Sequence, residues 1–255
     1  MSGATPLPPD GWPPEEPERP DEPERSEESP AGARGDAEPG DAKGPGDGLE
    51  DSDPAEPTDP KAYGGEQLGS FPLFALPKAW LFPGAVMPLL VFEPRYVQMV
   101  EDLLDRSGRL VIGTVQEGWE HEMLGAPPVH PVAGFGEIGR HERRPDGRYV
   151  IVVVGLGRVL VEETESDRLY RQVRAHRVVE NDELEEPELR DRLVGAIENL
   201  APEAKDIDAQ VPLGRLADFL LLRLSPGHDV LRRVYPELDE KRRAQRVLEV
   251  FDARN

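Results

Sequence analysis

The spacing of apolar residues changes once along the chain, near residue 180. Before that point, apolar side chains occur in short runs or alternate with polar ones, which is the pattern of β-strands. The segments with this pattern are residues 71–77, 85–92, 109–116, 132–143, 149–155, 158–165 and 170–180. After that point, apolar residues recur at the spacing of amphipathic helices. Strands followed by helices predict an α+β fold, and short, glycine-rich strands favour a closed or half-closed barrel of about six strands.

The densest apolar stretch, residues 81–100, is divided by prolines and a glycine. Pro83 and Gly84 predict a turn. The strand after this turn contains Pro88, which indicates an edge position or a bulge because proline cannot donate a ladder hydrogen bond. Pro94 suits the first position of one early helix. The stretch is therefore a turn, a strand and a helix, since a membrane helix needs about 18–20 uninterrupted apolar residues.

Three further assignments follow from local pattern. Residues 71–77 have prolines near their ends, which indicates an edge strand. Residues 149–155 are apolar on both faces, which indicates a central strand, and a two-glycine kink follows it. Helices are predicted behind Pro187 and behind Pro212. Asp239 is a candidate N-cap for the last helix.

Composition separates the first quarter of the chain from the rest. Residues 1–60 carry 18 acidic and four basic side chains, a formal charge of −14, and 14 of the 28 prolines. Such a segment buries too little apolar surface to offset the entropy of ordering it. We expect residues 1–66 to form a disordered acidic tail rich in proline and glycine, either solvating or an interaction arm. The ordered domain should span residues 67–253, with a β-barrel part at 67–180 and a helical part at 181–253.

Several classes of protein are disfavoured by composition. The chain has no cysteine, which excludes disulfides and thiolate metal sites. Its N-terminus lacks the basic start and apolar run of a signal peptide. We therefore expect a cytoplasmic, bacterial-type protein with no membrane segment.

Several short motifs match known catalytic or cofactor-binding motifs only in part. A glycine pair that starts at Gly155 follows a strong strand, but Leu160 stands where a dinucleotide fingerprint needs its third glycine. His121 begins a zinc-peptidase-like phrase that lacks the second histidine, and His130 and His141 lie in other segments, so we expect exposed histidines in loops. Neither a phosphate-binding loop nor a nucleophile elbow occurs. The sequence predicts no cofactor, no metal site and no catalytic residue.

Four arginines cluster around a predicted hairpin that turns at Asp146-Gly147. They are Arg140, Arg143, Arg144 and Arg148. A basic patch of this kind suits RNA phosphates. However, acidic residues interleave with the arginines, and the region after residue 60 is acidic overall, with a formal charge of −7, which opposes binding to a polyanion. Nucleic acid is therefore a disfavoured partner.

Aromatic side chains beside turns are candidate ligand contacts. Most large apolar residues belong to a core. Trp80, Phe82 and Trp119 stand next to turns or in a long glycine- and proline-rich loop, and we expect them to line an exposed groove. A groove of this kind binds extended peptide without any catalytic residue.

The first ordered segment resembles the opening of the Lon substrate-binding domain, the N-terminal domain of Lon proteases. The family's phrases P-L-F-x-L-P, L-F-P-G, P-L and F-E-x-R-Y correspond to residues 72–77, 81–84, 88–89 and 92–96. Later segments follow in the family's order, so the resemblance covers residues 67–253. The positions to which it assigns structural roles are Pro77, Phe82, Pro83, Gly84, Pro88, Phe92, Glu93, Arg95, Tyr96, Gly113, Gly155 and Arg158.

The resemblance implies a PUA-like β-pseudobarrel followed by a small helical bundle. A complete Lon protease continues into an ATPase with a phosphate loop and a peptidase with a Ser-Lys pair, and this sequence contains neither, so we expect a stand-alone, non-enzymatic domain. The expected function is to bind hydrophobic or unfolded polypeptide segments, linked to protein quality control through a separate protease or chaperone. The alternatives are a PUA-like RNA-binding module and, third, a hydrolase or peptidase.

Overall fold

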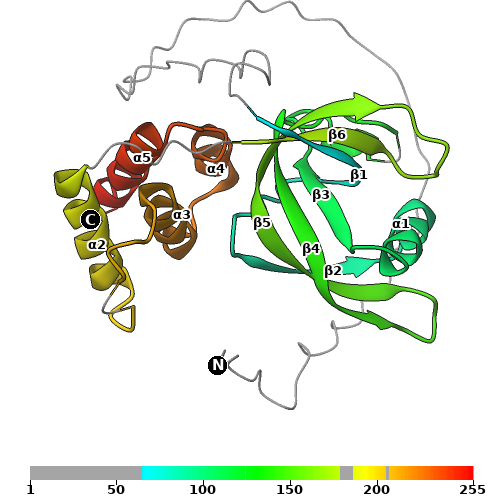
Figure 1. The fold of residues 1–255 in the computed structure, drawn as a ribbon, viewed down its shortest axis with the longest axis horizontal. Helices are drawn as coiled ribbons and strands as arrows, with labels where there is room; N and C mark the ends of the chain where they lie inside the picture. Colours follow the sequence, from blue (N-terminus) through cyan, green and yellow to red (C-terminus); the bar gives the residue numbers. More distant parts are fainter. Residues whose placement is uncertain (1–64, 124, 179–185, 205–206, 255) are drawn as a thin grey trace, which may run out of the picture. The chain divides into compact units, whose positions relative to one another are not determined.

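The computed structural model describes residues 65–123, 125–178, 186–204 and 207–254. Within these residues the strands are β1 (Gln67–Leu76), β2 (Val86–Val91), β3 (Arg109–Thr114), β4 (Val132–Arg143), β5 (Tyr149–Thr164) and β6 (Gln172–Arg177). The helices are α1 (Pro94–Leu104), the short 3₁₀ helix η2 (Glu120–Glu122), α2 (Pro187–Leu200), α3 (Leu213–Leu224), α4 (His228–Val234) and α5 (Glu240–Asp252) (Figure 1). The predicted α+β class is confirmed. The predicted tail, apart from its last two residues, and the predicted boundary at residue 180 lie outside the described residues.

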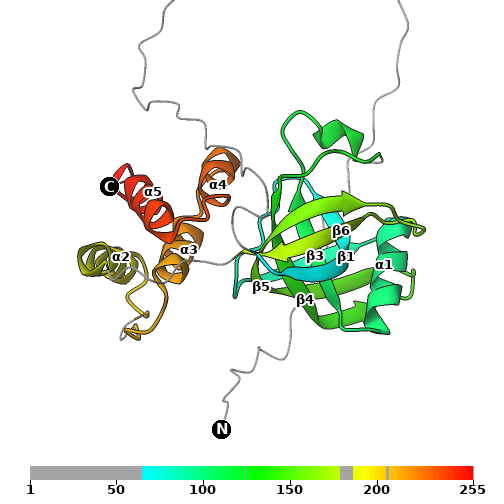
Figure 2. The ribbon, with the colours of Figure 1, turned by 45° about the horizontal axis from the view of Figure 1, so that its top comes forward.

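The strands form one sheet that closes on itself. Their order is β2-β5-β4-β3-β1-β6, and β5 also pairs with β6, which completes a ring of strands (Figure 2). The pairing of β1 with β3 is parallel and the other pairings are antiparallel. The long strand β5 makes closure possible, because its first half pairs with β2 and its second half pairs with β6.

Strand β1 is an interior strand, so the edge position predicted for residues 71–77 is wrong. It pairs with β6 through Pro72 and with β3 from Leu73 onward. The Leu73 N–H donates to the carbonyl of Arg171 at 2.9 Å, on the β6 side. Because successive backbone groups point to opposite sides of a strand, the Pro72 nitrogen faces the β3 side, where the ladder has not yet begun. The proline therefore costs the sheet no hydrogen bond.

Two other predictions concern β2 and β5. Strand β2 pairs only with β5, so the predicted edge position of Pro88 is confirmed. Strand β5 is one continuous strand rather than two strands joined by a kink. Gly157 lies opposite Phe135 and Gly155 lies opposite Gly136, which leaves Leu156 as an extra residue on β5. This arrangement is a β-bulge, and it turns one side chain out of the regular alternation.

Helix α1 packs against the barrel and supplies part of its core. Pro94 occupies the first turn, as predicted. Tyr96, Met99 and Val100 are buried in a cluster with inward-facing residues of β1, β3 and β5. The Tyr96 hydroxyl donates to the carbonyl of Ala75 at 3.1 Å. The helix therefore continues the barrel core.

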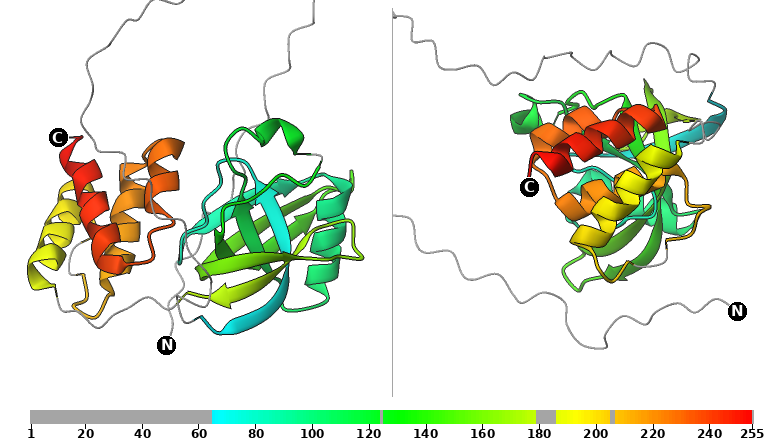
Figure 3. Two further views of the ribbon diagram at one scale, coloured as in Figure 1. Left: turned by 90° about the horizontal axis from the view of Figure 1, so that it is seen from above. Right: turned by 90° about the vertical axis from the view of Figure 1, so that its left-hand side faces the viewer.

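The C-terminal helices α2, α3 and α5 contact one another (Figure 3). The Asp239 side chain accepts a hydrogen bond from the Arg242 N–H at 2.9 Å, which confirms the predicted N-cap of α5. The apolar stripes of these helices pack in one cluster with barrel residues that include Trp80, Phe82 and Leu160. The strands and the helices therefore share a core. Among the described helices, none combines the length and the apolar character needed to cross a bilayer.

Candidate functional site

The three aromatic residues predicted to line a groove differ in burial. Trp80 is 6% exposed and Phe82 is 1% exposed, and both belong to the core shared with the helices. Trp119 is 42% exposed, in the loop that follows β3. Trp80 and Phe82 therefore do not line an exposed surface, because the C-terminal helices cover them.

Trp80 is held by a cluster of polar and aromatic groups. Its Nε1 donates to Nδ1 of His228 at 3.1 Å, and its ring lies 5.1 Å from the ring of His130 and 4.9 Å from that of Tyr235. The Nε2 of His130 lies 3.6 Å from a carboxylate oxygen of Glu117. Burial lowers the pKa of His130, although Glu117 acts in the opposite direction. His130 is therefore part of the packed structure, and the prediction that it is exposed was wrong.

The other two histidines of the sequence motifs are on the surface. His121 and His141 are exposed, as expected, although His141 lies in strand β4 rather than in a loop. In the part of the chain that the structure describes, no three histidine, aspartate or glutamate side chains are grouped as metal ligands would be.

Glycines allow the segment at residues 81–84 to lie directly on β4 and β5. A Cβ on Gly155 would stand 2.0 Å from the carbonyl oxygen of Phe82, and a Cβ on Gly134 would stand 2.6 Å from Leu81. Gly84 has a φ of 78°, a conformation that glycine adopts at little cost. The Gly84 N–H donates to the carbonyl of Gly155 at 2.7 Å. The family-motif glycines at 84 and 155 therefore have structural roles in this contact.

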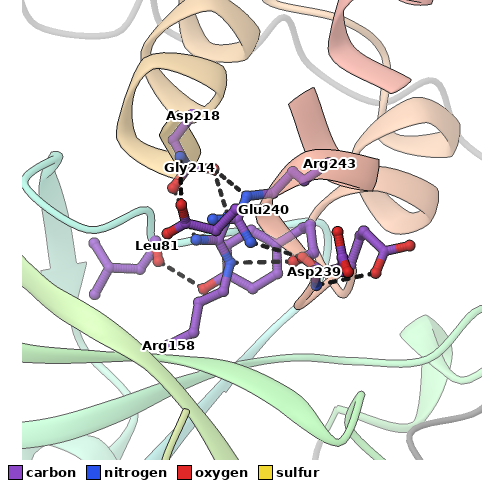
Figure 4. Close-up of polar contacts among 9 residues, drawn as sticks. Leu81, Arg158, Gly214, Asp218, Asp239, Glu240 and Arg243 are labelled. Atoms are coloured by element: carbon purple, nitrogen blue, oxygen red, sulfur yellow. Dashed lines mark hydrogen bonds and ion pairs between the residues drawn. The ribbon is translucent and has the colours of Figure 1, made fainter. Parts of the chain in front are cut away.

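Arg158 links the barrel to the helices through a buried ion pair with Asp218 of α3 (Figure 4). Two guanidinium nitrogens donate to the two carboxylate oxygens at 2.8 and 2.7 Å, and the Nε donates to the carbonyl of Tyr235 at 3.1 Å. The Arg158 side chain is 0% exposed and that of Asp218 is 3% exposed. The Tyr235 hydroxyl in turn donates to the carbonyl of Leu81 at 2.7 Å. This arrangement fixes a charged side chain of β5 against two helical elements.

A second buried arginine completes this network. The Nε of Arg243 lies 3.3 Å from Asp218, and its Nη1 donates to the carbonyl of Glu237 at 2.7 Å. Glu240 accepts the N–H of Gly214 at 3.1 Å. A Cβ on Gly214 would stand 2.2 Å from a nitrogen of Arg243, so α3 approaches α5 closely at this point. Two arginines and two carboxylates therefore share one buried site.

The motif of Glu93, Arg95 and Tyr96 anchors the long loop after β3. Arg95 pairs with Glu93 at 2.8 Å, and its guanidinium lies 4.6 Å from the centre of the Tyr96 ring. It also donates to the carbonyls of Met123 and Gly125. Burial raises the pKa of the Tyr96 phenol. The motif therefore builds a junction between α1 and the loop.

The remaining motif positions have different environments. Pro77 precedes Lys78, whose φ of 56° marks a tight turn. A Cβ on Gly113 would stand 2.8 Å from the side chain of Leu73, so the strands approach closely there. Phe92 is 62% exposed, so this motif position is not part of the core. With Val86 and Leu90 it forms an exposed apolar stripe at the outer face of β2, which we call the β2 stripe.

A pocket of about 620 Å³ opens at the bulge in β5, and we call it the bulge pocket. Its apolar lining consists of Leu68, Phe71, Phe135, Leu156, Val159 and Val178. Pro83 of the family motif and Arg158 of the buried network also border it. The rings of Phe71 and Phe135 meet edge to face, with centroids 4.8 Å apart.

Residues of the bulge border this opening. Leu156 is the extra residue and is 47% exposed. Gly157, the next residue, has no atom within 4 Å of the position that a Cβ would occupy. An apolar side chain at the entrance and empty space beside it leave room for a group from another molecule.

Besides Arg158, three further arginines border the same pocket: Arg109, Arg177 and Arg215. Arg109 forms an exposed ion pair with Glu137 at 3.1 Å. Neither Arg177 nor Arg215 has a carboxylate within ion-pairing distance among the described residues. The pocket therefore combines an apolar floor with cationic groups.

The arginines of the β4–β5 hairpin are partly neutralised by neighbours. Arg143 pairs with Glu101 at 3.4 Å, and Arg148 pairs with Asp146 at 2.6 Å. The hydrogen bond from the Arg148 side chain lowers the pKa of Asp146. These pairs reduce the positive charge that the hairpin presents to a polyanion.

The described residues form a β-barrel followed by helices, and sequence comparison shows the family of this domain. Residues 70–252 match the family described as the ATP-dependent protease La (LON) substrate-binding domain. The chain belongs to this family, as the resemblance in its opening motifs predicted.

Two curated relatives show the extent of the similarity. Lon protease 2 of Sorangium cellulosum is 31% identical over 112 residues, 44% of this chain and 14% of that protein. The Lon protease of Anaeromyxobacter dehalogenans is 24% identical over 194 residues, 71% of this chain and 23% of that protein. The chain thus spans less than a quarter of the length of these relatives.

Two solved structures share the fold. A Lon N-terminal domain protein from Xanthomonas campestris has a TM-score of 0.55 at 21% identity, with 71% of this chain and 98% of that chain covered. The N-terminal domain of a Mycobacterium avium complex Lon protease has a TM-score of 0.55 at 17% identity, with 72% and 98% covered. At these identities the likeness concerns the fold alone.

Proposed function

We propose that this domain binds extended polypeptide segments in the bulge pocket and catalyses no reaction itself. The observation that carries the proposal is an open pocket with an apolar floor, within the range of about 300–1,000 Å³ typical of ligand sites. The family is described as a substrate-binding domain of an ATP-dependent protease, which supports polypeptide as the ligand. We further propose that the captured segments pass to a separate protease or chaperone in the cytoplasm, as a step of protein quality control.

The pocket suits one apolar side chain at a time. Phe71 and Phe135 provide aromatic surface, and Leu156 extends it at the entrance. Complete burial of one leucine- or phenylalanine-sized side chain contributes about 1.5–3 kcal/mol. Ordering an unfolded segment opposes part of this gain. One such contact alone corresponds to a dissociation constant of millimolar order or weaker, so we expect weak, reversible binding that tightens only where neighbouring residues of the segment add contacts.

The test is fluorescence anisotropy with a labelled, unstructured peptide that carries leucine and phenylalanine. The variant Gly157→Trp should fill the pocket without a clash, because the space beside this glycine is open. Gly195→Trp is the matched control, since Gly195 of α2 also has open space around it and does not border the pocket. We expect saturable binding to the wild type and to Gly195→Trp, and at least about tenfold weaker binding to Gly157→Trp.

Two results would contradict the proposal. The absence of saturable peptide binding to the wild type would remove the function altogether. Undiminished binding to Gly157→Trp would remove the pocket as its site. The variant Phe92→Ser in the β2 stripe serves as a second control, because exposed apolar surface there is expected to make no contribution.

A further inference from the structure

The bulge pocket places cationic side chains beside an apolar floor, and we propose that it selects segments in which an apolar residue is flanked by carboxylates. This inference rests on the proposed function, because it names the class of polypeptide that the same pocket takes. The ligand is an extended chain with aspartate or glutamate next to leucine, phenylalanine or a similar residue.

The two arginines that carry this selectivity come from different elements. Arg177 ends β6 and is exposed. Arg215 lies in the first turn of α3 and is half-buried. A guanidinium nitrogen of Arg215 lies 3.2 Å from the position that a Cβ on Gly84 would occupy, so this side chain rests on the turn beside the pocket. Both border the pocket, and neither forms an ion pair with a carboxylate of the described residues.

Arg109 and Arg158 take different roles. Arg109 already shares its charge with Glu137 at 3.1 Å. Both terminal nitrogens of Arg158 donate hydrogen bonds to Asp218. Selectivity for an anion therefore falls to Arg177 and Arg215.

The charge of the pocket is opposite to that of the chain. Residues 61–255 hold 33 acidic and 26 basic side chains, a formal charge of −7. Arginines gathered at a concave site with apolar walls concentrate a positive potential there. A guanidinium also binds a carboxylate in a planar, two-point geometry. The carboxylates of a short acidic segment therefore complement the arginines of the pocket, and its apolar residue complements the apolar lining.

A polypeptide fits these features better than a nucleic acid. A nucleic acid would bring many phosphates to a chain of formal charge −21, whereas a peptide brings one or two carboxylates beside an apolar group. Most of the apolar lining is aliphatic, and it matches side chains such as leucine.

The experiment compares three labelled peptides with one apolar core, flanked by glutamate, by glutamine or by lysine. Each is titrated into the full-length wild type, the variant Arg177→Gln/Arg215→Gln and the control Arg140→Gln/Arg144→Gln. The control removes two exposed arginines of the hairpin, which lie outside the pocket. Circular dichroism and the melting temperature verify that each variant is folded. The single variant Arg177→Gln, at an exposed position, should also weaken the preference for the glutamate-flanked peptide.

We expect the glutamate-flanked peptide to bind the wild type about tenfold more tightly than the glutamine-flanked one, with the difference reduced by salt. The pocket variant should lose this preference and bind the glutamine-flanked peptide as the wild type does, whereas the hairpin control should keep it.

The outcomes separate this inference from the proposed function. Equal binding of the three peptides to the wild type would overturn the selectivity and leave peptide binding in place. Failure of every peptide to bind would overturn both. Displacement of the peptide by a single-stranded RNA that binds more tightly would overturn the inference in favour of phosphate recognition.

Discussion

Removal of the buried carboxylate of Asp218 should be among the most damaging polar substitutions in the domain. In Asp218→Asn, the guanidinium of Arg158 loses an anion at 2.7 and 2.8 Å, and that of Arg243 loses one at 3.3 Å. Both arginine side chains are 0% exposed, so water does not replace the lost partner. Breaking a buried pair by removing one member costs about 3–5 kcal/mol.

The opposite partner provides an internal comparison. In Arg158→Met, the carboxylate of Asp218 keeps its contact with Arg243, so no buried charge is left without a partner, and the apolar methionine side chain replaces part of the lost packing. Asp218→Asn should therefore be the more destabilising of the two. Arg192→Met is the surface control, since its pair with Asp252 is 60% and 58% exposed and should contribute less than about 1 kcal/mol.

Urea unfolding, followed by tryptophan fluorescence and by far-ultraviolet circular dichroism, measures these differences. We expect the two signals to coincide, because Trp80 lies in the core shared by strands and helices. For a domain of this size, a loss of about 3–5 kcal/mol lowers the melting temperature by about 6–20 °C. If Asp218→Asn were destabilised no more than Arg192→Met, the account of a buried carboxylate between two arginines would be refuted.

Three further predictions concern packing, pH and the long loop. Gly155→Ala should lower the free energy of unfolding by about 1–3 kcal/mol or more, because the new Cβ would stand 2.0 Å from a carbonyl oxygen. Gly157→Ala, where the space is open, should change the stability little. Thermal unfolding of both variants checks this difference. Burial, and a hydrogen bond to a carboxylate, raise the pKa of Tyr170 from 10.0 to about 12, so the folded state holds this proton more tightly than the unfolded chain. The stability that this proton contributes is therefore complete below about pH 10 and declines between about pH 10 and 12. Urea unfolding at alkaline pH should show this decline for the wild type and not for Tyr170→Phe. Arg95→Met should free the loop after β3 and speed its cleavage in limited proteolysis, and an unchanged cleavage pattern would contradict the anchoring role.

Local features of the fold could be predicted from the sequence because they depend on neighbouring residues. Pro94 begins a helix, Pro88 occupies an edge strand and Asp239 caps a helix, and each follows from the hydrogen bonds that one residue offers or lacks. The change in apolar spacing near residue 180 predicted strands before helices for the same reason. The motifs of the first ordered segment were enough to identify the family.

Burial and the candidate site depended on contacts between distant parts of the chain. Trp80 and Phe82 look like groove residues in sequence, but helices more than a hundred positions away cover them. The family resemblance marked Arg158 as a structural position, but its buried partner could not be identified from the local sequence because Asp218 lies 60 residues further on.

The bulge pocket had only one signal in the sequence, the glycine pair around Leu156, and that signal was interpreted as a kink. The sequence by itself determined the order and type of the elements, since hydrogen bonding and apolar period act over a few residues. Only the tertiary structure decided which apolar side chains remain exposed and which charges gather at the pocket, because both depend on how the barrel closes and where the helices pack.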